Sequence, residues 1–274
     1  MLLMMQFTLL STVFLLPIAL AGSVVLAIVY FENCSSMLIP LFYDADKLNM
    51  GLGGPASLIA WDPQRCPSLV FIGRSGTGKS TAAQIALGRV KRYAKGPGAR
   101  ATICDFKSEY TYLKGCPRHF DHNRCIDGLT SFAAENERRI CEGVTDADPL
   151  HALLFSEWGM FCSISDKRTR DEAISTVAGL IMSVRAQRMS VWLDLQRPDS
   201  QFMGTARDSL APIALGNLSP EGKRMAFPDY VDMLEPVGAN EGYFSDGVNP
   251  PRKIIIPTVT KWDILRKDVK ALVE

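Results

Sequence analysis

Short, continuously apolar runs recur through the middle of the chain, with segments of helical composition between them. Runs of this kind are typical of strands buried on both faces, so they predict an α/β fold with a mainly parallel sheet covered by helices. The expected strands are Ser68–Ile72, Ala101–Cys104, Leu150–Phe155, Ser190–Leu195 and Ile213–Leu215.

Two of the intervening segments carry apolar residues at helical spacing. Thr77–Tyr93 places Ala82 and Ile85 on one face, and Asp171–Arg188 repeats the pattern from Ile174 onward. Strand and helix therefore alternate, as expected for parallel strands that are joined by helical crossovers.

The flanks of this region have a different pattern. Residues 32–64 are short on periodicity and rich in turn formers, with Gly51–Pro55 marking a loop, so they are interpreted as a linker leading into the domain. Residues 65–274 are expected to form one α/β domain. Its tail, from Tyr243 to Glu274, predicts a closing strand at Ile254–Ile256 and a terminal helix.

The first 31 residues carry no charged side chain, and Phe7–Tyr30 gives 24 consecutive uncharged residues. A helix of that length spans about 36 Å, enough to cross a bilayer core of about 30 Å. Residues 1–31 are therefore predicted to be a transmembrane anchor. A cleaved signal peptide would carry an early basic region, whereas the first lysine is Lys47. A buried core helix is the third alternative.

The composition describes an ordinary folded protein. Of the 274 residues 47% are apolar and 22% are charged, which excludes a disordered chain. The net charge is +1, so bulk charge by itself predicts no nucleic-acid partner. Seven cysteines at irregular spacings indicate reduced thiols in a reducing compartment.

A glycine-rich octapeptide links the first expected strand to the first expected helix. Its sequence, GRSGTGKS, fits the phosphate-binding pattern G-x-x-x-x-G-K-[ST] at each fixed position. Lys79 is expected to reach the β and γ phosphates, Ser80 to ligate Mg²⁺, and Thr81 to contact the α phosphate. The octapeptide predicts a site for ATP and Mg²⁺. The residues expected to hold the nucleotide are Gly73, Arg74, Ser75, Gly76, Thr77, Gly78, Lys79, Ser80 and Thr81.

The strand Leu150–Phe155 is followed by Ser156 and Glu157. A P-loop ATPase usually has here an Asp that helps to hold Mg²⁺, and then a Glu that polarises the attacking water. Glu157 fits the second role, and a solvated strand end is the alternative reading. Ser156 has no charge and is expected to hold a metal-bound water only weakly. Hydrolysis is therefore expected to be slow unless another group compensates.

Five motifs, taken in order, resemble those of the FtsK/HerA superfamily of hexameric DNA translocases. The nearest resemblance is to the FtsK-like, TcpA-type coupling proteins of Gram-positive conjugative elements, and it runs from about Asp44 to about Asp229. The motifs are Gly73–Ser80, Cys104–Lys107, Leu153–Glu157, Asp194–Asp199 and Ala214–Ser219.

The resemblance implies a RecA-like P-loop NTPase domain behind the one transmembrane helix. It implies that Gln196 is a polar sensor near the γ phosphate. It also implies that Arg185, eleven residues earlier, acts across a subunit interface as an arginine finger. A helix-surface arginine is the alternative reading of Arg185. With Lys79 and Glu157, these two residues make up the expected catalytic set.

The resemblance also implies a function: an ATP-dependent translocase of double-stranded DNA that serves conjugative transfer. The implied assembly is a homo-hexamer with its motor domain in the cytoplasm and a single-pass anchor in the cell membrane. Relaxosome or conjugation-channel proteins would be its partners. Ser156 favours a rival, a membrane-bound regulatory or assembly ATPase with weak or no hydrolysis. A small-molecule kinase is less favoured, because the sequence shows no lid or acceptor site.

Two weaker patterns have competing interpretations. The basic run from Arg89 to Arg100 could contact DNA phosphates, but basic residues are also favoured at the C-terminal end of a helix. The series Cys116, His119, His122 and Cys125 has donor types suited to zinc, although the neighbouring glycine and proline indicate a loop.

Overall fold

The computed structural model describes residues 37–53 and 57–274. The expected transmembrane anchor, residues 1–31, lies outside these ranges. Within them, no helix combines the length and the hydropathy that a membrane span requires.

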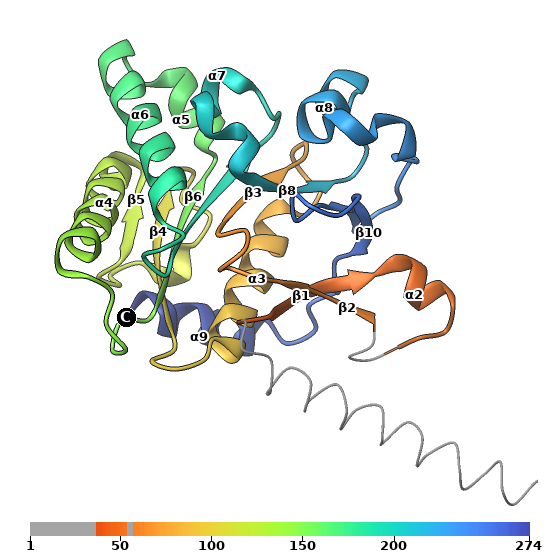
Figure 1. The fold of residues 1–274 in the computed structure, drawn as a ribbon, viewed down its shortest axis with the longest axis horizontal. Coiled ribbons are helices and arrows are strands. Elements are labelled where there is room, and N and C mark those ends of the chain that lie inside the picture. The colour runs from red at the N-terminus through yellow and green to blue at the C-terminus, as the bar shows by residue number, and fades with distance from the viewer. Residues whose placement is uncertain (1–36, 54–56) are drawn as a thin grey trace, which may run out of the picture.

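Ten strands of the described chain form one sheet, in the order β2-β1-β10-β9-β8-β3-β7-β6-β4-β5 (Figure 1). Their bounds are β1 Ile39–Asp44, β2 Leu58–Trp61, β3 Ser68–Ile72, β4 Ala99–Asp105, β5 His119–Asp121, β6 Leu150–Ser156, β7 Met189–Leu195, β8 Leu210–Leu215, β9 Glu241–Phe244 and β10 Arg252–Ile255. The part from β8 to β5 is parallel throughout, whereas β9, β10, β1 and β2 continue the sheet with antiparallel pairs. The predicted α/β fold with a mainly parallel core is confirmed.

The central strands are buried along their whole length. Each residue of β3, β6, β7 and β8 is buried, which is the pattern of strands covered on both faces. The strand that carries the octapeptide, β3, lies between β8 and β7, and β7 separates it from β6. This order puts the ends of three buried strands beside the phosphate-binding loop.

Helices cover both faces of the parallel part (Figure 1). The α-helices and 3₁₀ turns are α2 Ala45–Asn49, α3 Lys79–Tyr93, η2 Thr111–Leu113, η3 His122–Arg124, α4 Cys125–Glu142, α5 Trp158–Ile164, α6 Lys167–Ser183, α7 Ser200–Met203, η4 Gly204–Ser209, α8 Pro220–Ala226, η5 Pro228–Met233 and α9 Trp262–Val273. Apolar residues of α3 and α9 pack on one face, and those of α4, α5 and α6 pack on the other.

Helices α3 and α9 lie in close contact at Gly88. A β carbon at this position would lie 2.5 Å from Leu265 Cδ1, so glycine allows the terminal helix to approach α3. From α9, Val269, Leu272 and Val273 complete this side of the core. The terminal helix α9 therefore packs against α3, the helix that follows the octapeptide.

Most strands and helices match their predicted positions, with shifts at the ends. The helix expected at Asp171–Arg188 begins four residues earlier, at Lys167, where Asp166 caps it by accepting from Thr169 N. It ends at Ser183, so Arg185 lies in the turn before β7 rather than on the helix. The segment interpreted as a linker contributes β1, α2 and β2, and its strands extend the same sheet.

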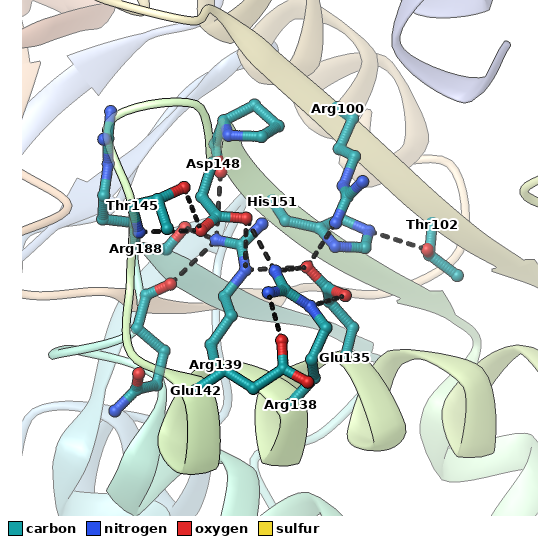
Figure 2. A network of polar contacts seen from close by, with 12 residues as sticks. Arg100, Thr102, Glu135, Arg138, Arg139, Glu142, Thr145, Asp148, His151 and Arg188 are labelled. Atoms are coloured by element: carbon teal, nitrogen blue, oxygen red, sulfur yellow. Dashed lines mark hydrogen bonds and ion pairs between the residues drawn. The ribbon is translucent and has the colours of Figure 1, made fainter.

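A network of charged side chains lies at the edge of the sheet where the parallel strands begin (Figure 2). The Arg139 side chain is fully buried. It donates to Glu135 on its own helix and to the carbonyl oxygens of Pro149, Gln187 and Arg188. These bonds tie α4 to the turns that lead into β6 and β7. Asp148, in the turn before β6, accepts from Arg138 and from Thr145.

Candidate functional site

The octapeptide Gly73–Ser80 forms the turn between β3 and α3. Two of its glycines, Gly76 (φ +83°) and Gly78 (φ +92°), take the left-handed backbone conformation that favours glycine. A β carbon at Gly73 would lie 2.5 Å from Thr77 Oγ1 and 2.7 Å from the Leu215 carbonyl oxygen. The sequence pattern therefore folds as a tight strand-to-helix turn, and the backbone N–H groups of the first turn of α3 are available to an anion.

Lys79, at the start of α3, is almost fully buried and points to the end of β7. Its Nζ lies 3.6 Å from Oδ1 of Asp194, and both side chains are at most 5% exposed. Among the described residues, that Asp194 oxygen has no hydrogen-bond partner. Burial raises the pKa of the Asp194 carboxyl to about 7, although the nearby Lys79 ammonium acts in the opposite direction. The Lys79 ammonium, which is expected to contact the phosphates, thus has the buried Asp194 carboxylate as its counter-ion.

Glu157 follows β6 directly and adopts a left-handed conformation, with φ at +54°. For a residue with a β carbon this backbone costs free energy, and such strain gathers at functional sites. The carboxylate is buried and accepts from Lys107 Nζ at 2.9 Å and from Gln196 Nε2 at 3.2 Å. The structure thus brings together two residues that the sequence predicts to be catalytic, Glu157 and Gln196.

Ser80 and Ser156, the two serines expected near Mg²⁺, have different environments. Ser80 Oγ donates to Glu109 Oε2 at 2.6 Å, and Glu109 is exposed. Ser156 is fully buried, and no described residue forms a hydrogen bond with its Oγ. Hydroxyl and carboxylate oxygens are the donors that Mg²⁺ prefers. With Asp194 at the same strand ends, this edge offers a donor set that fits the cation.

A hollow of about 350 Å³ lies beside the octapeptide, between Gly76, Thr77 and the loop that precedes β9. Its wall includes Asn217, whose side chain donates to the Val237 carbonyl and accepts from the Val237 amide. This pair of bonds joins the turn after β8 to the loop before β9. The fifth sequence motif therefore forms one wall of a space next to the phosphate-binding turn.

Arg185 lies away from these residues, in the turn before β7 begins. The octapeptide follows the end of β3, which is parallel to β7, so the two positions lie at opposite edges of the sheet. The Arg185 side chain is exposed and donates to the Gln64 carbonyl at 2.8 Å. It borders a hollow of about 520 Å³. Within one chain, Arg185 therefore does not join the other predicted catalytic residues.

The residues of the two weaker sequence patterns do not gather at one site. They make separate contacts in the fold. In the basic run, Arg92 pairs with Asp268 and Arg100 pairs with Glu135. In the cysteine and histidine series, His119 lies 3.3 Å from Asp105 and His122 Nδ1 lies 2.9 Å from the Phe106 carbonyl. A search of the described residues finds no group of three or more His, Cys, Asp or Glu arranged to hold a metal ion. The six cysteines within the described ranges are free thiols.

Sequence reasoning assigned no role to Asp194, Lys107 or Glu109. All three lie inside or next to quoted motifs, so spacing alone did not separate them from their neighbours. Asp194 could have been identified from the sequence, because it is the one charged residue in the apolar strand β7 and a buried charge is costly without a partner. Lys107 and Glu109 had none, because their contacts with Glu157 and Ser80 depend on the path of the loop after β4.

The sequence comparison gives partial matches. No protein-family model matches the chain. The FtsK domain-containing protein YdcQ of Bacillus subtilis (strain 168) is 30% identical over 128 residues, which are 44% of this chain and 26% of YdcQ. The chain therefore spans about a quarter of the length of the curated relative it matches.

The comparison of structures covers most of the chain. The pCW3 conjugation coupling protein TcpA, solved as a monomer with ATPγS, matches with a TM-score of 0.65 at 15% identity, over 86% of this chain and 71% of TcpA. The EssC ATPases 2 and 3 of Geobacillus thermodenitrificans match with a TM-score of 0.63 at 12% identity, over 87% of this chain and 49% of EssC. The type VII secretion ATPase EccC of Thermomonospora curvata matches with a TM-score of 0.60 at 15% identity, over 85% of this chain and 31% of the EccC chain. The chain thus has the fold of P-loop ATPases, and the predicted resemblance to FtsK-like coupling proteins is confirmed.

Proposed function

We propose that this chain is an ATP-driven motor that moves double-stranded DNA for conjugative transfer. The observation that carries the proposal is the contact between Glu157 and Gln196 at the ends of β6 and β7, beside a phosphate-binding turn that carries Lys79. A carboxylate and an amide in contact can orient one water molecule and detect the phosphate it attacks. These are the parts that nucleotide hydrolysis requires.

Each residue has a defined task in this proposal. The octapeptide binds the phosphates of ATP, and Lys79 exchanges its ion pair with Asp194 for one with the phosphates. Glu157 polarises the attacking water, and its hydrogen bond from Lys107 orients its carboxylate. Bound Mg²⁺ neutralises charge on the phosphates.

The DNA substrate rests on the resemblance rather than on the fold. EccC, which is named as a type VII secretion ATPase, shares this fold with TcpA, which is named as a conjugation coupling protein. The fold alone therefore does not choose between nucleic acid and polypeptide. The FtsK domain of YdcQ and the five motifs favour DNA.

The assembly and its location belong to the same proposal. The exposed Arg185, at the edge opposite the octapeptide, would reach a nucleotide only on a neighbouring subunit, as in a ring. A homo-hexamer with Arg185 as the finger in trans fits this placement. Residues 1–31 would anchor the ring in the cell membrane, facing the cytoplasm, beside relaxosome or channel proteins.

Ser156 supports a second candidate, a membrane-bound regulatory or assembly ATPase that binds ATP with little turnover. Its side chain is buried and uncharged at the position where a metal-holding Asp is usual. The difference between the two candidates is the hydrolysis rate, not nucleotide binding.

The test is ATP hydrolysis by the full chain, with and without double-stranded DNA. The motor predicts turnover that DNA stimulates and that Lys79→Ala abolishes. Lys114→Ala, which changes an exposed lysine in the loop after β4, is the matched control and should behave as wild type. Binding of ATP without turnover would favour the second candidate. Turnover that DNA does not change would rule out the translocase.

A further inference from the structure

Three positions form a row across the end of the sheet on the face that α3 covers. Successive side chains of a strand alternate between faces. Leu154 and Trp192 pack in the core on the α3 side, so Ser156 and Asp194, two residues further along β6 and β7, project to that side as well. Asp105 on β4 is the register partner of Ser156. Going from β4 through β6 to β7, toward β3, the row consists of Asp105, Ser156 and Asp194.

The two carboxylates of this row differ in their availability. Asp105 accepts from the Glu109 and Tyr110 amides at 2.9 and 2.8 Å, and it lies 3.3 Å from His119 Nε2. Its oxygens thus hold the loop after β4 in place. Asp194 is equally buried, but its Oδ1 has no hydrogen-bond partner among the described residues. Its charge partner is the Lys79 ammonium at 3.6 Å, so this oxygen still has room for a direct bond to a ligand.

We propose that Asp194 supplies the carboxylate that Ser156 lacks, so that Ser80 and Asp194 hold the Mg²⁺ that binds with the nucleotide. The acid has moved one strand, from β6 to the adjacent β7, on the same face of the sheet and at the same edge. The inference rests on the proposed nucleotide site and names a further residue of it. It also explains how the chain could bind Mg²⁺ although Ser156 stands at the position where an aspartate is usual.

The structure contains what such a transfer of role requires. Asp194 already faces Lys79, the residue after Gly78 that is to meet the phosphates. Ser156 Oγ, buried beside it on the next strand, is a hydroxyl that no described residue contacts by a hydrogen bond. In the absence of nucleotide, Lys79 balances the Asp194 charge, and nucleotide binding draws Lys79 away to the phosphates. The carboxylate is then free for the cation.

The test measures how much Mg²⁺ strengthens ATPγS binding to the full chain, by calorimetry in Mg²⁺ and in EDTA. For wild type we expect tighter binding in Mg²⁺. Asp194→Asn should reduce this gain by about 10-fold or more, the scale of losing a metal-holding partner. Its affinity in EDTA should change far less, because no cation is then held at Asp194. As a second readout, Mn²⁺ bound in the presence of ADP, followed by electron paramagnetic resonance, should fall in parallel.

Two further variants separate the cation from a general effect on the fold. The double variant Asp194→Asn with Ser156→Asp returns the acid to β6, so it should recover the Mg²⁺ gain. Asp208→Asn removes an exposed carboxylate before β8 and should leave the gain unchanged. Glu109→Gln tests the competing carboxylate at Ser80.

Each outcome decides between the alternatives. If Asp194→Asn keeps the full Mg²⁺ gain, or if Glu109→Gln alone removes it, the inference is wrong while the nucleotide site stands. The inference is also wrong if Asp194→Asn weakens binding equally in Mg²⁺ and EDTA, since Asp194 would then act only through Lys79. If wild type binds no ATPγS in either buffer, the proposed function fails and the inference fails with it.

Discussion

Two carboxylates at opposite edges of the parallel sheet have pKa values shifted in opposite directions. Where the strands begin, Glu135 accepts hydrogen bonds from Arg100, Arg138 and Arg139, and the hydrogen bond from Arg138 is the largest cause that lowers its pKa to about 2. Where the strands end, burial raises the pKa of Asp194 to about 7. The Glu135 carboxylate is satisfied by three arginines of the fold. Asp194 has the Lys79 ammonium at 3.6 Å, but its Oδ1 has no hydrogen-bond partner among the described residues, so a ligand can still supply one.

Removing Arg139 should break this contrast most strongly. Arg139→Met takes a donor from Glu135 and from the carbonyls that lead into β6 and β7. We expect the free energy of unfolding to fall by about 3 kcal/mol, because buried carbonyls lose their donor while Glu135 keeps only Arg100 and Arg138. Urea unfolding followed by circular dichroism measures it.

The matched control is an exposed pair with the same spacing. Arg168 and Glu172 are also four residues apart on a helix, and both side chains are at least 66% exposed. Arg168→Met should cost no more than about 0.5 kcal/mol. Equal losses for the two arginines would show that burial does not distinguish them.

Lowering the pH should destabilise the edge where the strands begin. The pKa of Glu135 is below its ordinary value of 4.5, so its contribution is present above that pH and is lost as the pH falls toward 2. Burial also lowers the pKa of His151 below 6.5, so the unfolded chain takes up a proton first as the pH falls. Both changes reduce the stability on acidification, with Glu135 contributing on the order of 2 kcal/mol.

Urea midpoints measured from about pH 7 down to about pH 3 test this sign. Glu135→Gln should flatten the acid part of the curve, and His151→Gln should flatten the part near pH 6. The raised pKa of Asp194 acts in the opposite direction between about pH 7 and pH 4, so each variant is compared with wild type. A slope that neither variant flattens would contradict the assignment of Glu135 and His151.

A smaller effect is expected at the other edge. In EDTA and without nucleotide, Asp194→Asn should change the free energy of unfolding by less than about 1 kcal/mol, because relief of the buried carboxylate is offset by the loss of the Lys79 counter-ion. Asp105→Asn, in the same row, should lower it by about 1–3 kcal/mol, because that carboxylate accepts two backbone amides. Thermal unfolding measures both. Destabilisation by both variants would mean that Asp194 is as structural as Asp105.

Much of the fold could be predicted because its signals are local. The strands β3, β6 and β7 are continuously apolar, and the octapeptide marks the turn into α3. By contrast, β1 and β2 lie in a segment rich in turn formers. They pair with each other, and β1 also pairs with β10, which is about two hundred residues away. No local period indicates such a pairing.

The site was partly predictable for the same reason. Glu157 and Gln196 follow recognisable strands, and parallel strands bring such residues to one edge. The carbonyl partners of Arg139 come from two separate turns, so no sequence spacing predicts them. The role of Asp194 depends on which face of β7 is directed toward Lys79, and the sequence alone does not give that orientation.

The most direct measurement of the central claim is the stability that ATPγS and Mg²⁺ add to the full chain. A ligand that completes the edge where the strands end should raise the free energy of unfolding by about 2.7 kcal/mol at a hundred times its dissociation constant. Lys79→Ala should abolish that gain, whereas Lys114→Ala should retain it. An equal gain in wild type and Lys79→Ala, or no gain in either, would contradict the nucleotide site on which the account depends.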